Sequence, residues 1–379
     1  MTNEEMRYDR HHLIEWWSQE KLRNSKVLVA GAGALGNEVL KNLAMLGVGN
    51  ITVIDFDTVS ITNLTRSVLF RESDVGLSKV EVARKEALEI NPEINIQAIH
   101  GDLEFDLGIG DVREHDLIIG CLDSVNARWA INQLAYRAGI PWINGGIGVA
   151  EGEMSFFDPN ESTACYECSI SEQMWQRRNQ RYSCQGTKRN IPETAMPTTA
   201  TIASMVGAMQ VQQALLYLHD KPGLLNSGEK IFMNLNPWMN FKVKIQRQED
   251  CIAHDMNIEP KICVKYDANL SLQEFFKDLN NRGFYQPILR LRNEVIHRML
   301  CLNTDCGYQE QINTPLRLFP SAKLNCPKCG YERDFEVIRN ISQEDFHENL
   351  IFGELCLPKN EILHCKTEKE LIAIQFCHM

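Results

Sequence analysis

The sequence predicts an α/β fold: a doubly wound sheet in a first domain, followed by a small C-terminal α+β domain with an inserted zinc ribbon. Three observations carry this prediction. Short apolar runs alternate with helical patterns from Lys26 to Asn144, which is typical of a parallel sheet with helices on both faces. A G-x-G-x-x-G turn joins the first apolar run to a helix. Four cysteines farther along the chain have the spacing of a zinc ribbon.

Residue types along the chain predict the individual elements. Runs rich in β-branched and aliphatic residues, bounded by turn residues, predict strands at 26–30, 50–54, 94–100, 117–121 and 141–144 and, with an antiparallel pattern, at 153–158 and 230–244. A long apolar stretch interrupted by glutamines predicts a core helix at 199–218 rather than a membrane span. We expect a first domain at 1–256 and a second at 261–379, which contains an amphipathic helix at 270–281 and the ribbon at about 298–334.

Composition and charge exclude several classes of protein. Of the 379 residues, 44% are hydrophobic and 23% are charged, which is typical of a folded globular chain and excludes a disordered one. Subtracting 50 acidic from 39 basic residues gives a net charge of −11, which argues against nucleic acid or an anionic membrane as the main partner. The first residues lack the features of a secretory signal, so we expect a cytoplasmic protein. There, thirteen cysteines favour metal binding and thiol chemistry over disulfides.

The glycine-rich turn predicts a nucleotide pocket. Gly31, Gly33 and Gly36 lie between a strand and a helix, where the missing side chains let the backbone approach a phosphate and the helix amino terminus offers partial positive charge. Asp55 follows about 20 residues later, where a carboxylate can accept both ribose hydroxyls. The pattern fits NAD as well as ATP, and glycines that merely permit tight packing are the alternative interpretation.

Three charged residues favour ATP over NAD. Arg66 and Lys79 can neutralise charge that develops on phosphates, and Asp123, at the end of a predicted strand, can hold Mg²⁺. Taken singly, each could be a solvated surface residue, so the inference depends on their combination. An NAD-dependent dehydrogenase would leave all three without a role, and the chain lacks an evident catalytic His or Tyr for it.

Several motifs, in order, resemble one known family. The chain contains RYDRHH, GAGALG, VIDFDTVSITNLTRS, VGLSKVEVAR, GCLDSVNAR, CYEC and ATIASMVGAMQVQQAL. Together they resemble the ThiF/MoeB/HesA superfamily of ubiquitin-like modifier activating enzymes, which adenylate the carboxyl terminus of a ubiquitin-fold protein. The resemblance spans roughly Arg7 to His254. The chain departs from the family's usual N-L-N-R-Q at Thr65 and Ser67, which removes two amide side chains and leaves the charged residues intact.

This resemblance implies a Rossmann-like adenylation domain that uses ATP and Mg²⁺. The nucleotide ligands that it implies are Gly31, Gly33, Gly36, Asp55, the adjacent Asp57 and Asn63. Arg66 and Lys79 would contact the phosphates, and Asp123 would bind Mg²⁺. Arg10, in the RYDR segment, is similar to an arginine that reaches across a dimer interface into the neighbouring subunit's ATP, which implies a homodimer.

Two groups of closely spaced ligand residues predict two Zn²⁺ sites. The first consists of Cys165, Cys168, Cys251 and His254. In the resembling family a cysteine pair stands near the place of Cys251-x2-His254, but imidazole is an ordinary zinc ligand; unrelated core cysteines are the alternative. The second consists of Cys301, Cys306, Cys326 and Cys329. It has the spacing of a ribbon, which has too little core to fold without metal and which binds either protein or nucleic acid.

Of the remaining cysteines, Cys184 has the most cationic surroundings. The nearby basic residues are Arg177, Arg178, Arg181, Lys188 and Arg189. Positive charge favours a thiolate, and the resembling enzymes carry a reactive cysteine in this crossover stretch, so we expect Cys184 to accept the activated carboxylate as a thioester. The alternative is an ordinary loop thiol in an enzyme whose chemistry ends at adenylation. Five other cysteines are interpreted as core or surface thiols: Cys121, Cys263, Cys356, Cys365 and Cys377.

The sequence thus predicts ATP-dependent activation of a ubiquitin-like protein that ends in glycine, followed by transfer to a conjugating enzyme. The segments ICVKYDANLSLQEFFKDL and ILHCKTEKELIAIQF resemble the edges of a ubiquitin-fold domain that recruits such an enzyme. One alternative is an adenylyltransferase for a sulfur-carrier protein, without a thioester relay. Another, from a different class, is a non-catalytic zinc scaffold with a degenerate nucleotide pocket.

Overall fold

The computed structural model describes residues 6–170, 197–254, 256–257, 259–320, 323–343 and 350–377. These residues form two compact units. The first unit holds the described residues up to Asn257 except 107–111. The second unit holds 107–111 together with the described residues from 259 onward.

Eight strands of the described chain form the mixed sheet of the first unit, in the order β3-β2-β1-β4-β5-β6-β7-β8. Their bounds are β1 Lys26–Ala30, β2 Asn50–Ile54, β3 Asn95–Ile99, β4 Leu117–Gly120, β5 Trp142–Ile147, β6 Glu151–Phe157, β7 Glu229–Leu235 and β8 Trp238–Lys244. β1 to β5 pair in parallel, and β6, β7 and β8 extend the sheet in antiparallel fashion. The strand order reverses at β1 and β4, and open sheets bind ligands beyond the carboxyl ends of the strands at such a point.

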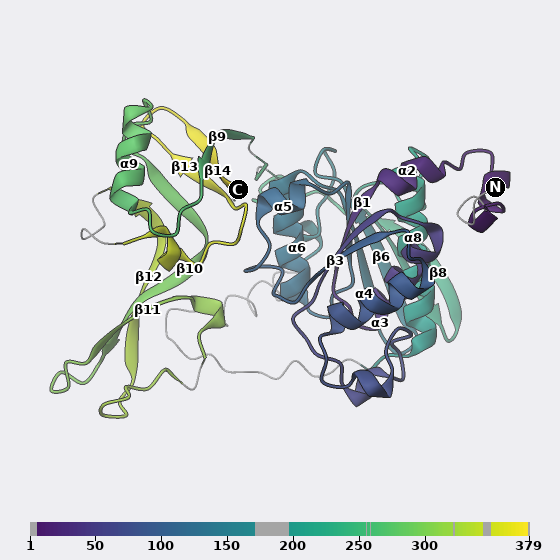
Figure 1. Ribbon diagram of the computed structural model, residues 1–379, viewed down its shortest axis with the longest axis horizontal. Helices are drawn as coiled ribbons and strands as arrows, with labels where there is room; N and C mark the ends of the chain where they lie inside the picture. The colour runs from purple at the N-terminus through teal and green to yellow at the C-terminus, as the bar shows by residue number, and fades with distance from the viewer. Residues whose placement is uncertain are drawn as a thin grey trace. The chain divides into compact units, whose positions relative to one another are not determined.

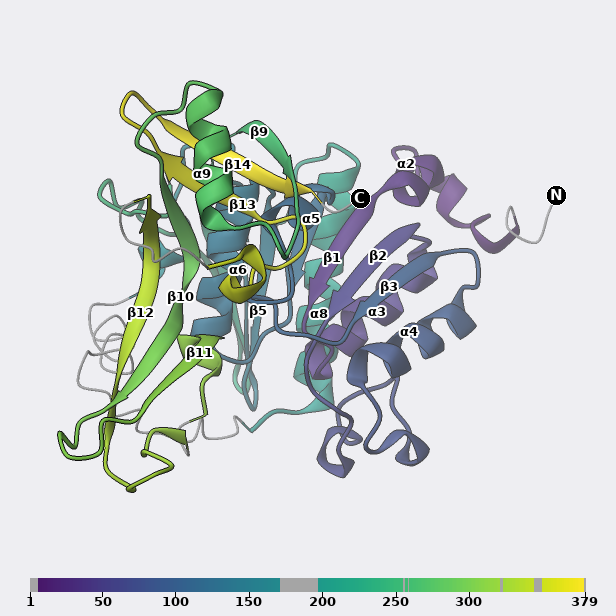
Figure 2. The ribbon, with the colours of Figure 1, turned by 60° about the vertical axis from the view of Figure 1, so that its left-hand side comes forward.

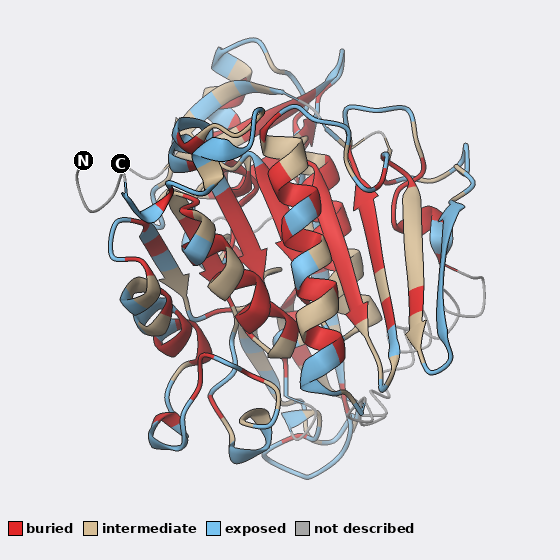
Figure 3. Cartoon of the chain, turned by 90° about the vertical axis from the view of Figure 1, so that its right-hand side faces the viewer, coloured by how far each residue is buried: buried red, intermediate tan, exposed pale blue. Residues whose placement is uncertain are grey.

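Helices cover both faces of this sheet. Their bounds are α2 Gln19–Asn24, α3 Ala34–Leu46, α4 Lys79–Ile90, α6 Val125–Ala138 and α8 Ala200–Leu218. A further short helix, α5 Ile109–Arg113, has residues in both units. α3 packs against α4 and α8 on one face, and α6 lies against β4 and β5 on the other (Figures 1 and 2). The central strands are buried between these layers (Figure 3). The doubly wound α/β fold that the sequence predicts is confirmed for this unit.

None of the helices in the described ranges combines the length and the apolar character needed to cross a bilayer.

A second sheet, covered on one face by a helix, forms the second unit. Its elements are β9 Pro260–Lys265, α9 Leu272–Asn281, β10 Ile288–Cys301, β11 Gln309–Pro315, β12 Arg333–Ser342, β13 Ile362–Lys366 and β14 Leu371–Cys377. Among the described residues the order is β11-β10-β13-β14-β9, with β12 also paired to β10 (Figure 2). Ser271 caps α9, because its hydroxyl accepts a hydrogen bond from the backbone N–H of Glu274 at 3.2 Å. Phe275 of α9 packs against Phe352 and Phe376.

One pair of cysteines corrects the expectation of free thiols. Cys263 in β9 and Cys377 in β14 form a disulfide with their Cα atoms 6.5 Å apart. The two strands pair in parallel, which brings together residues 114 positions apart in the sequence. Spacing along the chain does not reveal this pairing, because it arises from the register of the folded sheet. Cys121, Cys356 and Cys365 are free thiols, as expected.

Candidate active site and metal centres

The carboxyl ends of β1, β2 and β4 meet where the strand order reverses. The backbone N–H of Gly31 donates to the carbonyl oxygen of Ile54 at 2.8 Å, and the N–H of Cys121 donates to that of Ala30 at 2.8 Å. The segments that leave these three strands are therefore neighbours. They carry most of the residues that the sequence assigns to the nucleotide.

The surroundings of the three glycines in the turn differ. Gly31 has a φ of +97°, and a Cβ there would lie 2.5 Å from the carbonyl oxygen of Cys121. A Cβ on Gly36 would lie 2.0 Å from the carbonyl oxygen of Gly31. Tight packing therefore explains these two positions. At Gly33, which caps α3, no described atom would lie within 4 Å of a Cβ, so the space there is open to a ligand.

Asn37 holds this turn in place, although the sequence motifs did not indicate a role for it. Its side-chain amide donates to the carbonyl oxygens of Ala32 at 2.8 Å and Gly33 at 3.0 Å. Its Oδ1 accepts from the backbone N–H of Leu69 at 2.9 Å, and the side chain is fully buried. Asn37 thus ties the glycine turn to the segment that carries Arg66. A polar residue at a core-facing position of the predicted helix is the signal that could have found it.

Asp55 presents its carboxylate beside the turn. One oxygen accepts from the backbone N–H of Ala32 at 2.7 Å, and the other accepts from the N–H of Asp57 at 2.8 Å. A carboxylate has about four lone-pair sites, so this one can also accept from ligand hydroxyls. The open space at Gly33 and the fixed acceptor at Asp55 fit the phosphates and the ribose of a nucleotide.

The predicted phosphate contacts lie on the segments after β2. Lys79, at the start of α4, is 8% exposed, and its ammonium group lies 2.7 Å from a carboxylate oxygen of Asp57. Lys79 is therefore a buried cation fixed by an ion pair with Asp57, rather than a solvated surface charge. Arg66 donates to the carbonyl oxygen of Thr62 at 2.7 Å, and Asn63 accepts from the backbone N–H of Ser60 at 2.9 Å.

The other predicted site residues have more open settings. Asp123 is exposed two residues beyond Cys121, and the next residue, Ser124, caps α6 by accepting from the N–H of Ala127 at 3.1 Å. Arg10 is exposed in the segment before α2. Cys184 lies outside the described residues.

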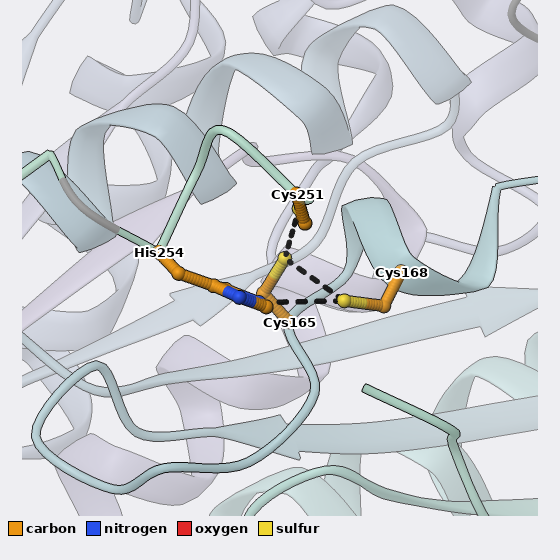
Figure 4. Close-up of side chains that lie close together, drawn as sticks. All are labelled: Cys165, Cys168, Cys251 and His254. Atoms are coloured by element: carbon orange, nitrogen blue, oxygen red, sulfur yellow. Dashed lines mark hydrogen bonds between the residues drawn. The ribbon is translucent and has the colours of Figure 1, made fainter. Parts of the chain in front are cut away.

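The first predicted metal cluster is assembled from two distant segments. Cys165 and Cys168 follow β6, whereas Cys251 and His254 follow β8 (Figure 4). The sulfur of Cys165 lies 3.8 Å from that of Cys168 and 3.6 Å from that of Cys251, and the sulfur of Cys168 lies 3.3 Å from Nε2 of His254. A tetrahedral zinc with bonds of about 2.3 Å separates its sulfur ligands by about 3.8 Å. The spacing and the donor set therefore fit Zn²⁺.

The thiols of this cluster share their protons unequally. Hydrogen bonds with Cys168 and Cys251, together with burial, raise the pKa of Cys165. Hydrogen bonds from Cys165 and Cys251 lower the pKa of Cys168. The lowered pKa favours the thiolate form of Cys168, and a cation is the natural partner of a buried thiolate.

The second cluster lies in the second unit. Its ligand atoms, from Cys301, Cys306, Cys326 and Cys329, all lie within 4.8 Å of one another. The sulfur of Cys301 is 3.5 Å from that of Cys329, and that of Cys306 is 3.9 Å from that of Cys326. Burial raises the pKa of the Cys326 thiol, but hydrogen bonds from the backbone N–H groups of Cys329 and Lys328 and with the Cys301 and Cys329 thiols together outweigh it and lower the pKa to about 7. Four thiols at this spacing fit a closed structural zinc site.

Comparison with known proteins decides the family. A model of the ThiF family matches residues 8–253, which is more than half of the chain. The chain belongs to the ThiF family. The match takes in the glycine turn, the charged residues beside it and the cysteines of the first cluster, so the family resemblance of the sequence motifs is confirmed.

Individual relatives of this ThiF-family chain are adenylyltransferases and activating enzymes. The molybdopterin-synthase adenylyltransferase of Escherichia coli (strain K12) is 37% identical over 262 residues, covering 66% of this chain and 97% of that protein. The SUMO-activating enzyme subunit 2 of Dictyostelium discoideum is 37% identical over 161 residues, covering 41% of this chain but 24% of that protein. The crystal structure of E. coli MccB with AMPCPP and MccA is 27% identical, with a TM-score of 0.54, and the alignment covers 67% of this chain and 75% of that one. These relationships identify the chain as an enzyme.

Proposed function

We propose that this ThiF-family enzyme adenylates the carboxyl-terminal glycine of a ubiquitin-fold sulfur-carrier protein, with ATP as the second substrate. The observation that carries the proposal is the open space at Gly33 beside the fixed carboxylate of Asp55. Similarity to a molybdopterin-synthase adenylyltransferase along 97% of its length favours this function over the thioester relay that the sequence predicts.

The reaction joins a carboxylate oxygen of the glycine to the α-phosphorus of ATP. The bond between that phosphorus and the oxygen that bridges to the β-phosphate breaks, and pyrophosphate leaves. Asp55 would hold the ribose while the glycine turn holds the phosphates. Lys79, fixed by Asp57, and Arg66 would balance the negative charge that grows on the departing pyrophosphate.

Mg²⁺ would be held by Asp123, whose exposed side chain lies two residues beyond Cys121, the residue against which Gly31 packs. The ion would supply further neutralisation of phosphate charge. Removal of this carboxylate is expected to abolish turnover and to leave the fold intact, because the side chain is not part of the core.

The test is carrier-dependent exchange of labelled pyrophosphate into ATP, with candidate ubiquitin-fold proteins that end in glycine. We expect exchange with the wild type and a loss on the order of 10²-fold or more for Asp123→Ala. Asp116→Ala is the matched control, because Asp116 is an exposed aspartate at the opposite end of the same strand. Full exchange by Asp123→Ala would refute the metal role, and no exchange with any carrier by the wild type would refute the function.

A thioester on Cys184, passed on to a conjugating enzyme, is the second candidate. Similarity to a SUMO-activating enzyme subunit and the basic residues around Cys184 favour it. Reducing and non-reducing gels of the wild type and Cys184→Ala, incubated with Mg·ATP and a carrier, discriminate the two. A thiol-sensitive adduct that is absent from the variant supports the relay, whereas exchange without an adduct supports adenylation alone.

We also propose Zn²⁺ in both cysteine clusters and a homodimer in which Arg10 completes the partner's site. Metal analysis is expected to find two zinc ions per chain. Mixing Arg10→Ala with Asp123→Ala tests the dimer, since a hybrid dimer holds one intact site. Two variants that are inactive alone should then recover about a quarter of wild-type exchange after random reassortment; no recovery would place Arg10 in its own subunit's site.

A further inference from the structure

A glutamine buried in α8 contacts the strand end that carries the predicted metal ligand. Gln210 is 0% exposed. Its side-chain amide donates to the carbonyl oxygen of Gly120 at 2.9 Å and to that of Ile143 at 3.4 Å. Its Oε1 faces the thiol of Cys121, whose sulfur lies 4.0 Å away. One side chain therefore bridges the carboxyl end of β4 and the first residues of the neighbouring strand β5.

This bridge lies where the two strands separate. The last paired residues of β4 and β5 are Gly120 and Asn144, and beyond them the chain turns toward Asp123. A buried polar side chain with both of its amide functions engaged fixes the backbone groups that it bonds. Gln210 thus sets where β4 ends and where the segment to Asp123 begins.

The same strand end supports the glycine turn. The carbonyl oxygen of Cys121 lies 2.5 Å from where a Cβ of Gly31 would be, and the Cβ of Cys121 lies 3.6 Å from where a Cβ of Gly36 would be. Any shift of Cys121 therefore moves the surface on which the turn packs. The turn and Asp123 share one anchor, and that anchor is bonded to Gln210.

We propose that Gln210 is a positioning residue of the adenylation site, which fixes the distance between the glycine turn and Asp123. The inference rests on the proposed function. Gln210 itself contacts no substrate, because its side chain is enclosed between α8 and the sheet. Its effect on ATP is exerted through Gly120 and Cys121.

The chain offers a matched control on the same helix. Gln213 is 1% exposed, donates to the carbonyl oxygen of Leu225 at 3.1 Å and accepts from the N–H of Leu225 at 3.0 Å. It resembles Gln210 in residue type, burial and bonding, but it anchors the loop after α8 rather than β4. Gln213→Met should therefore lower thermal stability much as Gln210→Met does, without the effect on ATP.

The experiment measures equilibrium binding of ATP, with and without Mg²⁺, to the full zinc-loaded chain. We expect Gln210→Met to bind Mg·ATP about tenfold more weakly or worse, and to lose most of the gain in affinity that Mg²⁺ gives the wild type. Gln213→Met should stay within about twofold of the wild type. Equal weakening in both variants, or unchanged binding in Gln210→Met, would overturn the inference.

Gln210→Glu supplies a second test that also serves if Gln210→Met does not fold. Burial raises the pKa of a carboxyl group, so at low pH the protonated acid can still donate to the oxygen of Gly120. Above that pKa the charged group accepts only and repels the carbonyl oxygens. The loss of affinity for Mg·ATP in Gln210→Glu, relative to the wild type, should therefore grow from pH 6 to pH 8.5. A loss of affinity that does not depend on pH would count against the role of the hydrogen bond to Gly120. Failure of the wild type to bind ATP would instead refute the proposed function and the inference with it.

Discussion

The two clusters that we propose as zinc sites have similar candidate ligands but different surroundings. Cys165 is fully buried and adjoins Tyr166, whose ring packs against Trp142 at 5.8 Å between ring centroids. Cys329 of the second cluster is exposed. The second cluster adjoins a small core whose buried members in the described chain are Ile296, Met299 and Phe319. The first cluster thus cross-links segments that already pack against a large hydrophobic core. The second cluster has only a small core beside it and would supply most of the stability of its segment.

The same contrast holds for the two units. The first unit is built around a sheet whose central strands are buried on both faces, and its site is defined by backbone geometry at the strand ends. The second unit has a smaller core, with a disulfide between β9 and β14 and a four-cysteine cluster beside β10, β11 and β12. Cross-links and metals stabilise small domains that cannot bury enough apolar surface. Their removal should therefore affect the second unit more than the first.

The largest effect is expected from the ribbon. Structural zinc in small domains contributes on the order of 10 kcal/mol to folding, so Cys329→Ser should release one zinc ion and unfold the segment 301–333. Hydrogen exchange followed by mass spectrometry checks this: protection should vanish in 301–333 and persist in α9 and in the first unit. Cys356→Ser, at an exposed cysteine outside both clusters, is the control. Unchanged protection at 301–333 after loss of the metal would contradict the inference that the second cluster replaces a hydrophobic core.

The disulfide should have the next largest effect. It joins residues 114 positions apart, and the chain-entropy model gives a stabilisation of about 5 kcal/mol for a cross-link of that span. Cys377→Ser should lower the free energy of unfolding of the second unit by about that amount and leave the transition of the first unit in place, as measured by calorimetry. Cys263→Ser and the double variant should match it, because each removes the same bond. Alkylation of both cysteines in the native wild-type protein would contradict the pairing.

The structures of these regions also differ in how far the sequence predicts them. The strands, the glycine turn and the Ser271 cap follow from local residue types, because each depends on contacts over a few positions. The close spacing of ligand residues within each pair also predicts which side chains come together in the two clusters. By contrast, Asn37 bonds Leu69, and Cys263 bonds Cys377. These contacts depend on which strands and helices become neighbours, which local pattern does not encode.

Among the site residues, too, some features follow from local sequence and others depend on the fold. The sequence indicates Lys79 as a phosphate ligand from its motif, but its burial and its ion pair with Asp57 arise only when α4 is placed beside the end of β2. Gln210 interrupts an apolar helix pattern, which marks it as buried and polar. Its partners at Gly120 and Ile143 come from segments 90 and 67 positions away. Motifs in the sequence thus suggest which residues take part in the chemistry. The contacts that hold these residues in place can be identified only from the folded structure.

The first cluster should tolerate damage better than the ribbon. His254→Ala removes one ligand and leaves three thiols, and the surrounding core should hold the sheet together. We expect the free energy of unfolding of the first unit to fall by about 2 kcal/mol, with affinity for Mg·ATP unchanged within about twofold. Denaturant titration and ATP binding on the same sample check both statements. Unfolding of the first unit, with loss of protection in β1 and β4, would show that this metal too replaces a core.

The smallest effect is expected from an ion pair that joins the same two parts of the second unit as the disulfide. Lys261 of β9 lies 2.5 Å from Glu370, the residue before β14, and their side chains are 49% and 45% exposed. Exposed pairs contribute about 0.2–1 kcal/mol, so a double-mutant cycle with Lys261→Met and Glu370→Gln should give a coupling energy in that range that disappears at about 1 M salt. A coupling energy near that of the disulfide would show that charge at this sheet edge, rather than the covalent link, holds β9 against β14.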